Sequence, residues 1–266
     1  MTEAPPQVSY ERAGSGDPVV LLHGIGGELC VWDPVWEALT AERDVIAVDL
    51  PGFGRSPALP ADQAPTPRAL AGVLDTFLTS LGVDRPHLVG NSLGGWIALE
   101  LARAGRARSV TALSPAGLWA APLLARGAPA RGRAHVVVRR LRPVLPILLS
   151  SRRVRRLALG HVIADPDRVP YRPALRIVRS YARASAYDAT NTAMRQSFFA
   201  GAEEIAVPVT LAFGERDRLI RPVRLPIPGA RSLILPGCGH IPMWDDPGLV
   251  SRLILDGVPE PMAWSR

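Results

Sequence analysis

Six short apolar runs recur along the chain and predict buried strands. Each run is rich in Val, Ile and Leu and does not alternate with polar residues. This pattern is typical of strands in a parallel sheet whose two faces are both covered by helices. The runs read PVVLLHG, DVIAVDL, PHLVGNS, SVTALSP, VTLAFGE and RSLILPG.

Helix-length segments separate these runs. Residues 67–81 carry apolar residues at helical spacing on one stripe, and Gly82 follows as a stop signal. Residues 93–104 predict a second helix. The alternation of strands and helices predicts an α/β fold with a mostly parallel, twisted sheet, right-handed crossovers and helices on both faces.

The alternation stops at about residue 118 and resumes near Val207. Between these points the chain is arginine-rich, helical in pattern and interrupted by prolines, and HVVV is the one run in it that resembles a strand. An insertion of this size between two strands of one sheet predicts a helical cap at residues 118–196. Residues 1–117 and 197–266 would then form the core.

Composition indicates a soluble globular protein, because hydrophobic residues make up 47% and charged residues 21%. No apolar run approaches the roughly 18 residues of a membrane span, and the start lacks the pattern of a secretory signal. We therefore expect a cytoplasmic protein. Two isolated cysteines, Cys30 and Cys238, argue against a disulfide framework or a zinc site, and neither metal nor cofactor is expected.

The net charge of +7 is concentrated in one segment. All 31 basic residues are arginines, and residues 118–200 hold 16 of them against three aspartates, a balance of +13 that leaves −6 for the remainder. The simplest interpretation is cap helices whose arginines face water. Two alternatives are a lid that docks on anionic lipid and one or two inward arginines that hold a substrate carboxylate. Nucleic-acid binding is not expected, since the segment has few aromatic residues and no known binding module.

Polar residues gather where the predicted strands end, which is where α/β sheets place their functional loops. Gly90-x-Ser92-x-Gly94 lies between a strand and a helix, in the context of a nucleophile elbow. His240 is the one histidine after the cap and follows the last strand. Asp217 precedes it, so nucleophile, acid and base occur in the order that this architecture requires.

Each of these residues has competitors. Glu215 is an alternative acid, but its place early in the turn suits local hydrogen bonds. Asp245 and Asp246 begin the final helix, where carboxylates usually cap. The other histidines are less suitable as the base, because His87 falls inside a strand, His135 and His161 fall in the cap, where they would face solvent or be hydrogen-bonded, and His23 belongs to a glycine-rich loop.

An oxyanion hole needs two backbone N–H donors. Leu93 follows the nucleophile and would supply one of them. The loop HGIGG after an early strand would supply the other, from Ile25. The loop has neither the P-loop pattern nor the glycine spacing of a dinucleotide site.

The chain resembles the α/β-hydrolase superfamily over nearly its whole core. HGIGG resembles the oxyanion loop of that superfamily, DLPGFGRS its structural loop beneath the site, GNSLGG its elbow, GERD its acid turn and GCGHIPMWDDP its histidine loop. The resemblance implies substrate contacts from His23, Gly24, Asn91 and Trp244. Asn91 and Trp244 further resemble residues of C–C bond hydrolases.

The chain departs from the family pattern at two places. The spacing from Asp217 to His240 is short, and residues 221–229 contain three prolines, so the helix between the last two strands should be shortened or lost. The oxyanion loop also lacks the proline that follows its second glycine in many C–C bond hydrolases.

The residues together predict a serine hydrolase that acts, without a cofactor, on a small or medium apolar ester, lactone or thioester. Ser92 would attack the carbonyl, His240 would transfer the proton and Asp217 would orient the imidazole. Hydrolysis of a C–C bond in a vinylogous diketone, a non-hydrolytic reaction and ligand binding without turnover remain alternatives. A monomer and a homodimer are both compatible with the sequence.

Overall fold

The computed structural model describes residues 7–123, 132–222 and 227–257. Its centre is a seven-stranded sheet in the order β1-β3-β2-β4-β5-β6-β7. Only β1 runs antiparallel to its neighbour, so the sheet is mostly parallel, as predicted. The strands are β1 Tyr10–Ala13, β2 Pro18–Leu22, β3 Asp44–Val48, β4 His87–Asn91, β5 Ser109–Leu113, β6 Val209–Gly214 and β7 Arg231–Leu235.

The six apolar runs correspond to β2 through β7, but the prediction that all six are buried is wrong for β7, which is largely exposed at the edge of the sheet. Strands β3 to β6 are buried along their whole length, which explains why their sequences are continuously apolar. The first strand was not predicted. Its sequence, YERA, is short and largely exposed at the sheet edge, so it carries no apolar signal.

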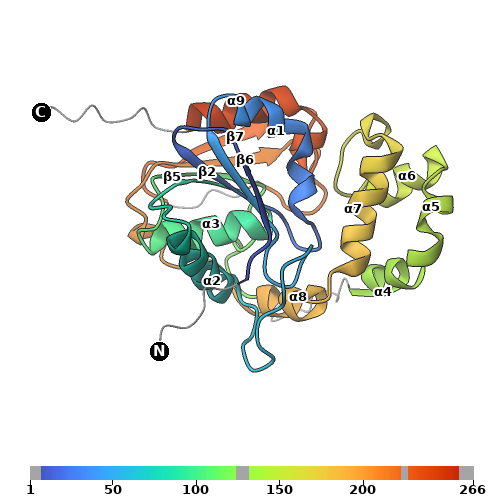
Figure 1. Cartoon of the computed structure of the whole chain (residues 1–266), viewed down its shortest axis with the longest axis horizontal. Coiled ribbons are helices and arrows are strands. Elements are labelled where there is room, and N and C mark those ends of the chain that lie inside the picture. Colours follow the sequence, from blue (N-terminus) through green and yellow to red (C-terminus); the bar gives the residue numbers. More distant parts are fainter. Residues whose placement is uncertain (1–6, 124–131, 223–226, 258–266) are drawn as a thin grey trace, which may run out of the picture.

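Two layers of helix cover the sheet (Figure 1). Helices α1 (Asp33–Thr40) and α9 (Pro247–Gly257) pack together over one face, and α2 (Pro67–Ser80) and α3 (Leu93–Arg103) pack together over the other. Both helices predicted from the sequence are confirmed. Thr66 begins α2, because its hydroxyl oxygen accepts the Ala69 N–H at 3.1 Å.

A group of helices follows β5 and precedes β6, in the segment predicted as a cap. They are α4 (Gly132–Arg140), α5 (Leu145–Leu148), α6 (Arg152–Leu159), α7 (Tyr171–Arg183) and α8 (Tyr187–Gln196). The HVVV run lies in α4 and not in a strand, because the period of the surrounding residues is helical. Helices α4 to α7 form a separate lobe beside the sheet with its own small hydrophobic cluster (Figure 1).

Short 3-10 turns link the larger elements. These are η1 (Leu29–Trp32), η3 (Arg142–Val144), η4 (Pro166–Arg168), η5 (Ala202–Glu204) and η6 (Pro242–Trp244). Between β6 and β7, the described residues 215–222 and 227–230 contain no helix, as the prolines there predicted. Strand β7 still pairs parallel to β6.

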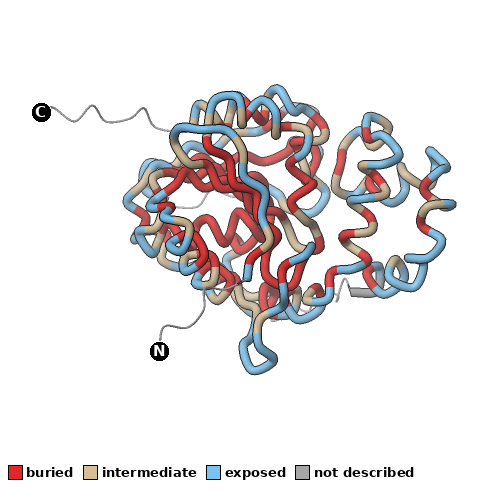
Figure 2. The backbone as a smooth tube through the Cα atoms, viewed as in Figure 1, coloured by how far each residue is buried: buried red, intermediate tan, exposed pale blue. Residues whose placement is uncertain are grey.

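The register of the strands brings the functional loops to one edge of the sheet. Leu22 pairs with Gly90, and Asn91 pairs with Leu113, so β2, β4 and β5 end at nearly the same level. Figure 2 shows this central region as the most continuously buried part of the molecule. Side chains that follow these strands therefore lie near one another at the carboxyl edge of the sheet, at the end of the buried core.

Candidate active site

Ser92 occupies a strained turn between β4 and α3. Its backbone has φ 56° and ψ −114°, a conformation that side-chain-bearing residues rarely adopt. The turn is held by the Ser92 N–H, which donates to the Leu113 carbonyl at 2.9 Å. A Cβ on Gly90 would lie 2.1 Å from the Gly94 carbonyl oxygen, and one on Gly94 would lie 2.1 Å from that of Leu22. Glycine is therefore required on both sides of the serine.

The glycine-rich loop after β2 lies directly beside this serine. A Cβ built on Gly24 would be 3.2 Å from the Ser92 Cβ, so the backbone of the loop lies close to Ser92. Ile25 follows Gly24 in the loop and is half-buried. On the other side, Leu93 is the first residue of α3, where backbone N–H groups have no partner within the helix.

His240 and Asp217 form a buried pair. The Nδ1 of His240 lies 2.8 Å from Oδ2 of Asp217, whose side chain is 1% exposed. Burial raises the pKa of Asp217. The hydrogen bond and charge of His240 lower it, as do the N–H groups of Leu219 and Ile220. These lowering effects together outweigh burial, so the pKa of Asp217 lies below its ordinary value. An ionised carboxylate only accepts hydrogen bonds, so Nδ1 carries the proton and Nε2 of the neutral ring is left as a base.

Asn91 connects the elbow to the histidine loop. Its Nδ2 donates to the carbonyl oxygens of His240 at 2.8 Å and Leu113 at 3.1 Å. Asn91 is buried and immediately precedes Ser92, so these bonds fix the position of the histidine backbone relative to the nucleophile. Its amide group is thus used inside the protein, whereas the sequence interpretation assigned Asn91 to the substrate.

His23 holds the glycine-rich loop in place through two hydrogen bonds to the backbone. Its Nε2 accepts the Leu50 N–H at 2.9 Å, which leaves Nδ1 to donate to the Gly24 carbonyl at 2.7 Å. Burial lowers the pKa of His23, in agreement with a neutral ring that accepts a backbone hydrogen bond. Both ring nitrogens are engaged, so we interpret His23 as a support of the loop and no longer as a substrate contact.

Asp49 of the DLPGFGRS segment has the structural role that the resemblance implied. It is buried, and its carboxylate accepts the N–H groups of Leu29 at 2.8 Å and Arg55 at 2.9 Å. The Ser56 hydroxyl donates to the Asp49 carbonyl at 2.6 Å. The loop that carries Asp49 is therefore joined by a hydrogen bond to Leu29, in the segment after the glycine-rich loop.

Asp245 joins the cap to the histidine loop, a role that sequence reasoning missed. Its Oδ2 accepts the Gly239 N–H at 2.7 Å and the Ala164 N–H at 3.1 Å, and its Oδ1 accepts the Asp165 N–H at 2.9 Å. The prediction that Asp245 caps the final helix is therefore wrong. Asp246 has that role, since its carboxylate accepts the Leu249 N–H. No local sequence signal reveals the role of Asp245, because two of its partners lie 80 residues away in the chain.

The remaining predicted residues are placed as follows. Trp244 in η6 is half-buried where the core meets the cap, and its Nε1 has no hydrogen-bond partner among the described residues. Glu215 accepts the Gly237 N–H at 2.8 Å, which is the local role expected of it. His87 is buried beside Ser109, and burial lowers its pKa to about 3, so it stays neutral within the sheet.

The cap contacts the core over the glycine-rich loop. A Cβ on Gly26 would lie 2.6 Å from a ring carbon of Tyr181 on α7 and 3.3 Å from one of Tyr187 on α8. His135 of α4 stacks on Tyr187, with ring centroids 4.4 Å apart. These aromatic rings therefore place three cap helices directly over the loop beside Ser92.

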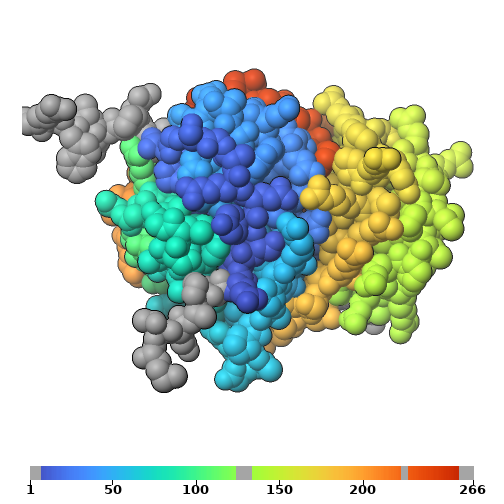
Figure 3. Space-filling view, in the orientation of Figure 1, coloured from blue at the N-terminus to red at the C-terminus, as the bar shows by residue number. Residues whose placement is uncertain are grey.

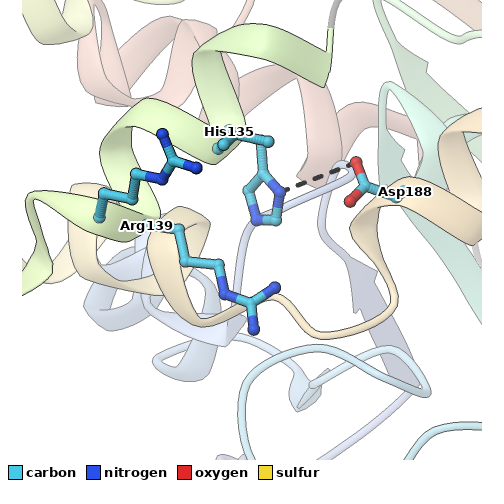
Figure 4. A pocket seen from close by; sticks show the side chains of 5 residues that line it. His135, Arg139 and Asp188 are labelled. Atoms are coloured by element: carbon cyan, nitrogen blue, oxygen red, sulfur yellow. Dashed lines mark ion pairs between the residues drawn. The ribbon is translucent and has the colours of Figure 1, made fainter.

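A surface cavity of about 350 Å³ lies next to this aromatic cluster (Figure 4). His135 is buried and points toward Asp188, with 3.8 Å between Nδ1 and the nearer carboxylate oxygen, yet neither ring nitrogen has a hydrogen-bond partner among the described residues. The expectation that His135 faces solvent or is hydrogen-bonded is thus wrong. His161, by contrast, is exposed.

Comparison with known proteins agrees with this geometry. The profile of the "Alpha/beta hydrolase family" matches residues 19–253. Epoxide hydrolase EphH of Mycobacterium tuberculosis is 36% identical over 212 residues, which cover 72% of this chain and 94% of the relative. The chain therefore belongs to the alpha/beta hydrolase family, and its fold and site define a hydrolase of small molecules.

Solved structures show the same fold. The enol-lactonase from Burkholderia xenovorans superposes with a TM-score of 0.73 at 21% identity and covers 95% of this chain and 96% of its own. A thermophilic esterase from Thermogutta terrifontis superposes with a TM-score of 0.69 at 22% identity, covering 94% of this chain and 92% of its own.

None of the helices in the described part of the chain is long and apolar enough to span a bilayer. Residues 7–123, 132–222 and 227–257 contain no group of three or more His, Cys, Asp or Glu side chains placed to hold a metal ion.

Proposed function

We propose that this protein is a serine hydrolase that cleaves a small or medium apolar ester, lactone or thioester. The observation that carries the proposal is the convergence of a strained serine and a carboxylate-oriented histidine at one edge of the sheet. Ser92 has the φ of 56° that exposes an elbow side chain, and Asn91 next to it binds the backbone of His240. Asp217 fixes the tautomer of His240 that can accept a proton.

The reaction would follow from these positions. Nε2 of His240 takes the Ser92 hydroxyl proton while the oxygen attacks the substrate carbonyl, and the N–H groups of Leu93 and Ile25 stabilise the oxyanion. His240 then gives the proton to the leaving group, and an acyl group remains on Ser92. Water, deprotonated by His240, cleaves this ester and restores the serine.

An apolar substrate suits the surroundings of the glycine-rich loop. Ile25 and Tyr181 pack against the main hydrophobic cluster, and Tyr187 is buried within it. Burial raises the pKa of the Tyr181 phenol, so the ring stays neutral at any physiological pH. The esterase and enol-lactonase named above act on ester-type bonds according to their names, which agrees with this substrate class.

Epoxide hydrolysis is the second candidate, because the relative EphH is named for it. The residue at the elbow disfavours a covalent route to that reaction. Attack on an epoxide carbon by Ser92 would leave an ether, which has no carbonyl for water to attack, so the enzyme could not be regenerated. Attack on an ester carbonyl leaves an ester, which water can cleave.

A substrate panel separates these candidates. We expect the protein to hydrolyse p-nitrophenyl esters of graded chain length and to leave an aryl epoxide and a vinylogous diketone unchanged. Ser92→Ala should lower ester turnover by on the order of 10⁶-fold, because the nucleophile is lost. Ser80→Ala, at the end of α2, is the matched control and should keep full activity.

Two results would overturn the proposal. One is ester hydrolysis that survives in Ser92→Ala. The other is turnover of the epoxide or the diketone in preference to every ester of the panel.

A further inference from the structure

The outer side of the cap exposes apolar side chains in a row. Val137, Leu141, Val144 and Ile147 follow one another at intervals of four, three and three residues along α4, η3 and α5, which succeed each other with one residue between α4 and η3. Each is at least 40% exposed, and Ile147 is 74% exposed. On α6, Leu157 is 76% exposed. Isolated exposed apolar residues are normal, but a row at helical spacing is a feature of an interaction surface.

The same helices also have a buried side, so the exposed row is not a sign of poor packing. Leu145, Leu149 and Leu159 are at most 4% exposed and pack against α7 in the cap's hydrophobic cluster. The exposed residues of the row are not part of this cluster. The cap segments form one whole side of the molecule, and much of their outer surface is exposed (Figures 2 and 3).

Arginines surround the exposed row. Residues 132–160 contain eight arginines and no acidic residue. Of these, Arg139, Arg140, Arg142 and Arg153 are exposed, and no ion pair joins them to a carboxylate in the described part of the chain. Arg139 and Arg140 line the surface cavity beside His135 and Asp188, so we define the outer cap face as Arg142 and Arg153 together with Val137, Leu141, Val144, Ile147 and Leu157.

We propose that the outer cap face docks on an anionic phospholipid surface. Exposed helices that combine cationic and aliphatic side chains lie in the interfacial region of a bilayer, where the apolar residues enter the acyl boundary and the cations meet lipid phosphates. Arginine suits this position because its guanidinium binds phosphate bidentately. The docking stands on surface residues alone and does not depend on the reaction at Ser92.

The composition of the face disfavours other partners. A second copy of the chain would place arginine-rich segments that hold no acidic residue against each other. A nucleic acid would find little surface for base stacking, since residues 132–160 contain no Phe, Tyr or Trp, and it would leave Ile147 and Leu157 without an apolar partner. Lipid offers both the phosphates and the acyl chains.

Vesicle flotation tests the proposal directly. We expect the protein to float with vesicles of phosphatidylcholine and phosphatidylglycerol, to remain below vesicles of phosphatidylcholine alone, and to detach at about 0.5 M NaCl. Arg142→Glu with Arg153→Glu, and separately Ile147→Asp with Leu157→Asp, should each weaken binding by on the order of tenfold or more. Both pairs should keep the turnover of a soluble short ester, which shows that the variants fold.

Matched controls come from the core. Arg68→Glu with Arg252→Glu changes the net charge by the same amount on α2 and α9, and Ile234→Asp removes an apolar side chain that is 50% exposed on β7. Neither should alter flotation. Equal binding to both kinds of vesicle, or equal loss in the control and the cap variants, would contradict the proposal.

A fluorescent label supplies a second measurement. Both native cysteines are buried, so Leu157→Cys offers one reactive thiol for an environment-sensitive dye. Anionic vesicles should shift the emission of this dye to the blue, because the site enters an apolar phase, and should leave a dye at Arg68→Cys unchanged. Concentration-dependent dimers that form without vesicles, with no shift at residue 157, would identify a second copy as the partner and overturn the proposal.

Discussion

At the scale of single residues, the Asp217–His240 pair decides what the site can do. Asp217 accepts three hydrogen bonds, and they hold its pKa below the ordinary value of 3.8. Replacing it with asparagine keeps the shape but permits the wrong tautomer of His240. We expect Asp217→Asn to lower kcat on a soluble ester by on the order of 10⁴-fold.

The same pair makes stability depend on pH. Because the folded-state pKa of Asp217 is depressed, its ionised form stabilises the fold at neutral pH, and this contribution disappears as pH falls through the folded-state pKa. Urea unfolding should therefore show the wild type more stable than Asp217→Asn near pH 6, with a difference that shrinks below about pH 4. Asp62→Asn, at an exposed position, is the control. A difference that grows toward low pH would refute this account.

At this scale the sequence carried a hypothesis for the chemistry but none for the residues that support it. Ser92, Asp217 and His240 were predicted as a triad because their order and their places after strands follow from what a triad needs, and the structure joins Asp217 to His240 by a hydrogen bond. The roles of Asn91 and His23 in holding loops could not be read from the chain. Both depend on backbone groups, such as the His240 carbonyl and the Leu50 N–H, whose positions only the fold provides.

At the scale of elements, the cap is hydrogen-bonded to the loop that carries His240, the proposed base. Ile241 N–H donates to the Val162 carbonyl at 2.8 Å, and Asp245 accepts N–H groups from both the histidine loop and the cap. A shift of the cap would therefore move His240. The sequence predicted the helices of the core from their apolar stripes, but it gave no sign of this connection, because carboxylates at a helix start ordinarily cap.

Asp245→Asn tests the connection. The amide has one acceptor oxygen where the carboxylate has two, so at least one of three N–H groups loses its partner, and we expect a loss of about 1–3 kcal/mol in unfolding free energy. Because His240 would be misplaced, kcat on a short ester should fall by roughly tenfold or more with a smaller change in KM.

Asp246→Ala is the control for this experiment. It removes the side-chain cap of α9 at a cost of about 1 kcal/mol and should leave kcat unchanged. If both variants lost similar stability and both kept full kcat, Asp245 would be a structural residue without influence on the base.

At the scale of the whole molecule, charge is divided between the two parts of the chain. The arginine-rich insertion was evident in the sequence, and the structure adds which of its arginines are exposed and which are paired. Arg156, for example, is paired with Asp167, whereas Arg153 is not paired within the described residues. The sequence could not separate these cases, because pairing depends on how α6 meets the loop that follows it.

Elements of the fold could be predicted where apolar residues form a run or recur at helical spacing along the chain. They could not be predicted where this pattern is absent. Six strands were predicted from their apolar runs. The exposed edge strand β1 carries no such run, and the valines of α4 resemble a strand until their neighbours are shown to be helical. In both cases the local pattern was weak, and the tertiary contacts decided the structure.

The central claim is that Ser92 forms a covalent acyl-enzyme, and labelling by a fluorophosphonate followed by peptide mass spectrometry tests it most directly. The account predicts one adduct per chain, located on Ser92, with loss of ester hydrolysis in proportion to labelling. It also predicts no adduct in Ser92→Ala. Inactivation with the adduct on another residue, or full turnover by protein whose Ser92 is completely labelled, would contradict it.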